Sequence, residues 1–147
     1  MSPTPSRHTA AVDTPAAAVW VGPEGVHRLR FKPVARLTLA DVEALQRARV
    51  SLGAAGRGRL VLVELAHRPL PTPEAAAYAK RPEVLALTAA MALVTPNALV
   101  QAFGNAFLGV LRPDYPTRLF RHEADALAWL LARPLGPETR EPAASGA

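Results

Sequence analysis

Cysteine is absent from the 147 residues of this chain, and the absence excludes disulfides, thiolate metal sites and cysteine nucleophiles. Aromatic residues are also few, with two Trp, two Tyr and four Phe. Lysine occurs only at Lys32 and Lys80. Nucleic-acid surfaces usually combine clustered positive charges with stacking aromatic side chains. The scarcity of aromatic residues therefore argues against that class of partner.

Arginine, alanine and proline are abundant instead. Fifteen of the 17 basic residues are Arg, and the chain also holds 30 Ala and 15 Pro. A codon bias toward Ala, Arg, Pro and Gly is sufficient to explain much of the pI near 10.7. The net charge of +5 is thus weak evidence for a nucleic-acid partner.

The length and the 50% apolar content fit one globular domain. Residues 1–18 and 134–147 are rich in Pro, Ala and small polar residues and have no apolar periodicity, so we predict flexible tails there. The folded domain is expected to span residues 19–133. The N-terminus has no continuous apolar stretch after a basic start, so we expect no signal peptide and a cytoplasmic location.

A long uncharged stretch runs from Val84 to Leu111. Its length alone would permit a membrane crossing. However, Thr95, Pro96 and Asn97 interrupt the apolar run, which favours a buried strand followed by a helix. We therefore expect no membrane span.

The apolar periodicity and the turn residues predict nine elements in the order β-β-α-β-α-β-α-β-α. The first two strands form a β-hairpin, Thr38 caps the first helix, and Thr72 caps the second. This order predicts an α/β fold with a mostly parallel sheet, an N-terminal hairpin and packed helices. The expected strands cover 19–21, 26–31, 60–65, 90–94 and 117–120, and the helices that follow Thr38 and Thr72 are joined by helices over 96–111 and 124–131.

The C-terminal half of the chain carries a recognisable pattern. It comprises Gly104-Asn-Ala-Phe-Leu-Gly109, Tyr115-Pro-Thr-Arg-Leu-Phe120 and Ala126-Leu-Ala-Trp-Leu130. With the hairpin, helix and strand before it, this pattern resembles small bacterial proteins of the STAS-like fold, to which anti-sigma-factor antagonists belong. The resemblance covers nearly all of residues 19–133.

The resemblance implies a non-enzymatic signalling domain that binds a partner protein such as a kinase or a sigma-regulatory protein. Some relatives are switched by phosphorylation of a Ser or Thr at the start of the helix after the central strand. Here an Asp-Ser-Ser-Gly-like turn is replaced by residues 67–73, His-Arg-Pro-Leu-Pro-Thr-Pro. Thr72 is therefore the candidate phosphate acceptor, and its ordinary role would be to cap the helix.

The expected helix over 96–111 offers the candidate partner surface. Asn97, Gln101 and Asn105 recur every four residues and form one stripe without charge. The helix is either covered by its own domain or presented to another chain, where amides pair without the desolvation cost of charges. Alternatively, Phe103 and Phe107 line a cavity for a small apolar ligand.

The most concentrated positive charge is expected on the hairpin. Arg28, Arg30 and Lys32 alternate along its second strand, and Arg118 is a candidate neighbour. Such a basic patch is either a solvated edge that charge protects from aggregation, or a surface for an acidic partner. Nucleic acid is the third possibility.

Catalytic candidates are poor. The four His residues lack metal-ligand spacing. Glu64 and His67 end the central strand, where ligand groups are common, but no nucleophile accompanies them. The Gly-rich loop 53–58 precedes a strand and not a helix, so it is a connecting turn and not a phosphate loop.

From the sequence we expect no enzyme activity, no cofactor and no metal. The favoured function is protein–protein association in bacterial signalling, with a homodimer as one form of it. A carrier or sensor of a small apolar ligand is the alternative, and a weak electrostatic nucleic-acid binder is third.

Overall fold

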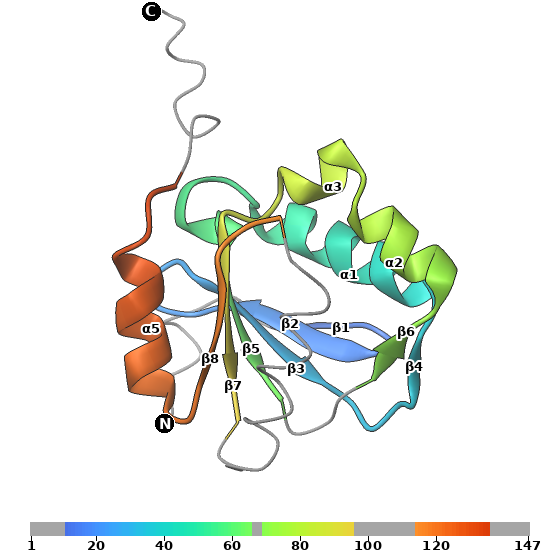
Figure 1. Ribbon diagram of the computed structural model, residues 1–147, viewed down its shortest axis with the longest axis horizontal. Helices are drawn as coiled ribbons and strands as arrows, with labels where there is room; N and C mark the ends of the chain where they lie inside the picture. Colours follow the sequence, from blue (N-terminus) through green and yellow to red (C-terminus); the bar gives the residue numbers. More distant parts are fainter. Residues whose placement is uncertain (1–10, 66–68, 96–113, 136–147) are drawn as a thin grey trace, which may run out of the picture.

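A six-stranded sheet forms the centre of the molecule (Figure 1). The computed structural model of the protein describes residues 11–65, 69–95 and 114–135. The strands of this sheet are β1 (Val12–Asp13), β2 (Ala17–Val21), β3 (His27–Phe31), β5 (Leu60–Glu64), β7 (Ala90–Val94) and β8 (Thr117–Phe120). The helices are α1 (Leu39–Leu52), α2 (Pro73–Ala79), α3 (Pro82–Leu85) and α5 (Glu123–Leu131), with the 3₁₀-helix η2 (Gly56–Arg59) before β5.

The strand order is β1-β2-β3-β5-β7-β8. β1, β2 and β3 are antiparallel neighbours, whereas β3, β5, β7 and β8 run parallel. The α/β fold, the mostly parallel sheet and the N-terminal hairpin are thus confirmed. Within the described residues the hairpin, the helices after Thr38 and Thr72, and the strands from 60, 90 and 117 all lie where the sequence predicts them.

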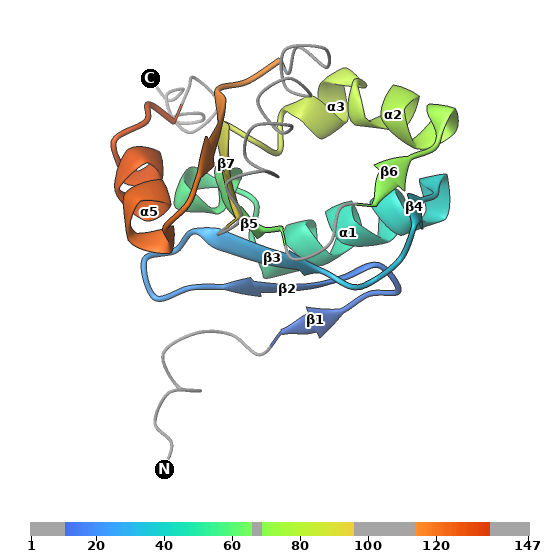
Figure 2. The ribbon, with the colours of Figure 1, turned by 60° about the horizontal axis from the view of Figure 1, so that its bottom comes forward.

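Helices pack on both faces of the sheet (Figure 2). α1 contacts β2 and, through its outer side, α2, while α5 contacts β5, β7 and β8 from the opposite face. The register explains this division, because residues paired across neighbouring strands point to the same face. One face carries Val19, Leu29 and Val63, and the other carries Leu62 and Ala92.

Each face has its own core. The core between α1 and the sheet consists of Ala17, Val19, Leu29, Leu45, Ala48, Val61 and Val63. The core on the α5 side consists of Val26, Leu60, Leu62, Ala90, Ala92, Ala126 and Leu130. β5 contributes to both clusters, which is why its sequence shows no alternation of apolar and polar residues.

The predicted N-terminal tail, residues 1–18, is wrong for residues 12–18. β1 and the start of β2 fall inside it, and Thr14 closes the turn between them by hydrogen bonds with Ala17. Ala16 and Ala17 are fully buried. Composition alone suggested disorder because these residues are small. Residues 1–10 lie outside the described residues.

The predicted C-terminal tail also includes a residue that packs against the folded domain. Leu135 lies in the predicted tail, 134–147, yet it packs against the core beneath α5, and its carbonyl accepts a hydrogen bond from Arg59. Residues 136–147 lie outside the described residues.

A second, two-stranded sheet was not predicted. β4 (Arg36–Leu37) and β6 (Leu70–Pro71) pair in parallel, immediately before α1 and α2 respectively. Two residues per strand are too few for an alternating pattern to be visible in the sequence. The pairing sets the amino ends of α1 and α2 side by side.

Thr38 fixes the start of α1 through a capping box. Its side chain accepts a hydrogen bond from the Asp41 amide at 3.1 Å, and the Asp41 carboxylate accepts one from the Thr38 amide at 3.0 Å. Gly53 ends the helix in the left-handed conformation, with φ of 95°. Both ends of α1 are therefore set by local sequence.

Thr38→Ala should lower the free energy of unfolding by about 1 kcal/mol, because it leaves the Asp41 amide without its acceptor. Thr38→Ser keeps the hydroxyl and should stay near the wild-type value. Urea unfolding monitored by circular dichroism measures both. A Ser variant as unstable as the Ala variant would contradict a capping role.

Candidate interaction surface

No described helix covers the hairpin half of the sheet face opposite α1. Paired residues place Trp20 beside Arg28, and Ala18 beside Arg30 and Glu64, on this face. Trp20, Ala18 and Glu64 are half-buried and Arg30 is exposed, whereas Ala17 and Val19 on the α1 face of the same strand are fully buried. Among the described elements, α5 covers the β5–β7–β8 half of this face. We call Ala18, Trp20, Arg30 and Glu64 the open face.

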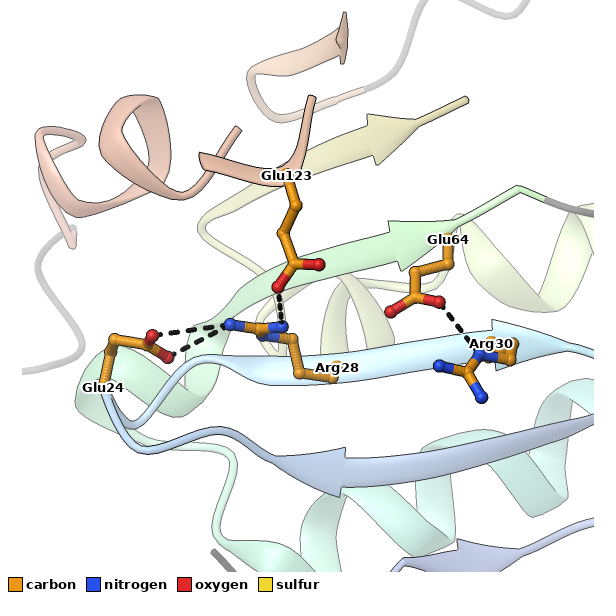
Figure 3. Close-up of polar contacts among 5 residues, drawn as sticks. All are labelled: Glu24, Arg28, Arg30, Glu64 and Glu123. Carbon is orange, nitrogen blue, oxygen red and sulfur yellow. Dashed lines mark hydrogen bonds and ion pairs between the residues drawn. The ribbon is translucent and has the colours of Figure 1, made fainter. Parts of the chain in front are cut away.

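Arg28 borders the open face and is buried (Figure 3). Its guanidinium lies between two carboxylates: Glu123, at the start of α5, and Glu24, in the hairpin turn, 3.3 Å away. Sequence alternation suggested a wet face for Arg28. The structure corrects this expectation, because α5 approaches this end of β3 and brings a counter-charge with it.

Arg30 lies one pleat further along and contacts Glu64, as Figure 3 shows, and Trp20. Its Nε donates a hydrogen bond to Glu64 at 2.9 Å, and its guanidinium lies 5.3 Å from the centre of the Trp20 ring. The side chain is nevertheless 57% exposed. Trp and Arg are the residue types that most often dominate protein–protein interfaces, because they combine a large apolar area with polar groups.

The expected basic patch is wrong in its charge balance. Arg28 and Arg30 are paired as described, and Lys32 forms an ion pair with Asp13 at 2.8 Å. Arg118 instead lies over the Phe120 ring, 5.3 Å from its centre. The acidic partners come from β1, the hairpin turn, β5 and α5. Most of them lie far from the cations along the chain, so the sequence pattern did not predict these ion pairs. Three of the four charges are thus locally neutralised.

The remaining predicted residues fall into two groups. Thr72 caps α2: its side chain accepts a hydrogen bond from the Ala75 amide at 3.2 Å. The capping role is confirmed, and its phosphorylation stays a prediction. The other candidates, namely Asn97, Gln101, Phe103, Asn105, Phe107 and His67, lie outside the described residues. Neither the partner stripe nor the apolar cavity expected there is described by the structure.

A buried polar network at the amino ends of the strands was missed by the sequence analysis. Arg49, in the last turn of α1, is 2% exposed. Its Nε donates to His27 Nδ1 at 3.1 Å, its Nη1 donates to Thr88 at 2.8 Å, and its Nη2 donates to the Gly58 carbonyl at 3.1 Å. Nη2 also donates to the Leu87 carbonyl. In the described part of the chain, no carboxylate pairs with Arg49.

The network fixes the protonation of His27. Burial and the charge of Arg49 lower the pKa of His27 from 6.5 to about 4. The ring is therefore neutral at pH 7, with Nδ1 accepting from Arg49 and Nε2 donating to the Gly53 carbonyl at 3.1 Å. Burial also lowers the pKa of Arg49 to about 10 and raises the pKa of nearby Tyr115. All hydrogen-bonding groups of Arg49 and His27 are occupied, so this network is structural.

Other site types find little support in the described residues. No group of three or more His, Asp or Glu side chains there is placed to hold a metal ion. An open hollow of about 290 Å³ lies near the amino ends of the strands, lined by residues such as Arg59, Thr88 and Tyr115. Within these same ranges, no helix has the length and apolar character that crossing a membrane requires.

Comparison with known proteins supplies a family. The family described as "Domain of unknown function (DUF7793)" matches residues 19–132. The chain belongs to this family. The DUF7793 match begins at Val19, within β2, and ends just after α5. It therefore contains Trp20, Arg30 and Glu64 of the open face but not Ala18.

Solved and curated proteins add little to the DUF7793 assignment. A crystal structure of a protein with unknown function from Arthrobacter sp. FB24 is 27% identical, over 81% of this chain and 95% of that one, with a TM-score of 0.27. No curated protein matches the chain. Conclusions about this DUF7793 domain therefore rest on its own geometry.

Arg28→Met should cost about 2 kcal/mol of stability, because it leaves two carboxylates without the cation between them. Arg30→Met, at the 57% exposed site, should cost less than about 1 kcal/mol. Urea unfolding of both variants at neutral pH measures the difference. Equal losses of stability in the two variants would show that the burial of Arg28 does not strengthen the contribution of its ion pairs.

His27 should make stability depend on pH. The unfolded chain, with a pKa of 6.5, binds a proton more readily than the folded protein, with a pKa of about 4. Stability should thus fall as the pH drops from 6.5 to 4, by about 3 kcal/mol from this residue alone. His27→Gln should remove that share of the slope, and His122→Gln, at an exposed site, should not. Unfolding curves across this pH range would reveal either outcome.

Proposed function

We propose that this domain is non-catalytic and acts in bacterial signalling by binding a partner protein through the open face of its sheet. We place it in the cytoplasm. The observation that carries the proposal is the exposure of the Arg30–Trp20 pair on a sheet face that the described helices leave uncovered.

The Arg30 side chain is both ordered and exposed. Arg30 would otherwise be a mobile exposed side chain, but Glu64 and Trp20 hold its guanidinium in one position. A partner that docks there loses little additional side-chain entropy, because the Arg30 side chain is already ordered. The half-buried Trp20 ring adds apolar area beside this fixed cation.

The balance of charge supports a protein partner over nucleic acid. Glu64 pairs with Arg30, and Glu24 and Glu123 pair with Arg28, so among the described residues the cations beside Trp20 offer no excess positive charge to phosphates. Mixed charges around an aromatic residue suit a protein surface with its own polar rim.

The STAS-like resemblance supports the same class of function. It suggests a kinase or a sigma-regulatory protein as the partner. Thr72 would be the phosphate acceptor in such a switch, and its place at the start of α2 suits added negative charge. The small-ligand alternative depends on Phe103 and Phe107, which lie outside the described residues.

Photocrosslinking in cells of the source organism tests the proposal. A photoreactive amino acid replaces Ala18 on the open face, and a control chain carries it at Arg47, which is exposed on α1. We expect a discrete crosslinked protein from position 18 that is absent from position 47. Mass spectrometry identifies that protein.

The purified partner then permits a quantitative test. Arg30→Glu and Trp20→Ala should each weaken binding by about tenfold or more, since each removes a central contact. Arg47→Glu makes the same change of charge on α1 and should leave the affinity unchanged. An affinity that the open-face substitutions leave unchanged, or equal crosslinking from positions 18 and 47, would refute the proposal.

A further inference from the structure

The outer edge of β8 carries backbone groups without partners. β8 ends the strand order, so it has one neighbour, β7. The carbonyls of Pro116 and Phe120 accept hydrogen bonds from Met91 and Thr95, each at 2.9 Å. Alternate residues of a strand direct their backbone groups to opposite sides. The N–H and C=O groups of Thr117 and Leu119 therefore point away from β7, and no described residue pairs with them.

The side chains along this edge are cationic. Arg118 and Arg121 are exposed, and no carboxylate of the described chain forms an ion pair with either. Two nearby carboxylates are already paired, because Asp114 binds Lys80 and Glu123 binds Arg28. Arg118 and Arg121 therefore carry positive charges that no carboxylate of the described residues pairs with.

An aromatic pair continues the same surface. Phe120 and Trp129 pack with ring centres 5.7 Å apart, joining β8 to α5. Arg118 lies over the first ring, and Arg133 lies over the second at 5.1 Å from its centre. Both rings remain half-buried. A residue placed next to Arg118 and Phe120 would thus meet a cation and an apolar surface together.

The opposite edge of the sheet is different. β1 has two residues, and Pro15 lies two positions after it, so it offers little backbone for a further strand. β8 has four residues and no proline. Of the two edges, β8 is the one able to accept another strand.

We propose that the outer edge of β8 binds an extended acidic segment of a partner protein, which adds as a further strand and places carboxylates beside Arg118 and Arg121. Backbone hydrogen bonds to Thr117 and Leu119 supply the register. The charges select the occupant, since a second copy of this strand would bring its own arginines against these two. The site is separate from the open face and does not depend on the function proposed for it.

Nuclear magnetic resonance of the full-length, ¹⁵N-labelled chain tests this proposal. The probe is the acetylated and amidated peptide (Glu-Val)₄, titrated to its solubility limit. We expect saturable shifts in Thr117 to Arg121 and slower hydrogen exchange at the Thr117 and Leu119 amides. The matched peptide (Lys-Val)₄ has the same strand propensity and opposite charge, and it should not bind.

Two further changes separate backbone pairing from simple charge attraction. Two further (Glu-Val)₄ peptides carry N-methyl groups on every Glu or on every Val. One of the two should no longer slow hydrogen exchange at the Thr117 and Leu119 amides. Arg118→Glu should weaken binding by about tenfold or more. Arg30→Glu, which removes a cation from the open face, should leave it unchanged, so that failure here is distinct from failure of the proposed function.

Three outcomes would overturn the proposal. The first is the absence of amide protection at Thr117 and Leu119 with the acidic peptide. The second is protection of these amides without peptide that rises with protein concentration, since the occupant is then a second copy. The third is preferential binding of oligothymidylate at Arg118 and Phe120, which would make the edge a nucleic-acid site.

Discussion

Arg49, a buried arginine that pairs with no carboxylate among the described residues, holds the amino ends of the strands together. Arg49 reaches from α1 to His27 on β3, to Gly58 in η2 and to Thr88 before β7. Removing a charged group from water is costly unless every donor finds an acceptor. Here carbonyl, hydroxyl and imidazole acceptors meet that demand. The positions of α1, η2 and the loop before β7 therefore depend on each other.

The same network explains one local sequence requirement. A Cβ atom at Gly58 would overlap with the carbonyl of Gly53, whose oxygen accepts the hydrogen bond from His27. The Gly-rich segment after α1 is thus a close crossing of two backbones that also supplies acceptors. It is a connection, as the order of elements indicated, but its glycine has a packing role.

Local patterns predicted most of the fold. Thr38 and Thr72 marked two helix starts correctly, and the unbroken apolar runs beginning at Leu60 and Ala90 marked two central strands. Small residues misled the prediction, because Ala16 and Ala17 were assigned to a tail although both are fully buried, Ala17 in the core beneath α1. Burial of alanine is decided by what packs above it, and no period in the sequence records that.

The candidate site was harder to predict from the sequence than the fold was. Arg28 and Arg30 were recognised as candidates, but their partners Glu123 and Glu64 lie 95 and 34 positions away. Ion pairs of this separation depend on strand order and register, which single-sequence patterns do not specify. Trp20 and Arg49 carried no signal at all, since a lone aromatic residue or arginine has no spacing to detect. The STAS-like kinship stays a prediction beside the membership in the DUF7793 family.

The small β4–β6 sheet has a mechanical consequence for the two helices that follow it. The Leu70 amide donates to the Ala35 carbonyl at 3.0 Å, and the Thr72 amide donates to the Leu37 carbonyl at 2.9 Å. These bonds join the amino ends of α1 and α2 to each other, and the two helices are also in contact. Neither helix can tilt alone without breaking these hydrogen bonds. The two helices should hence move, and unfold, as one unit.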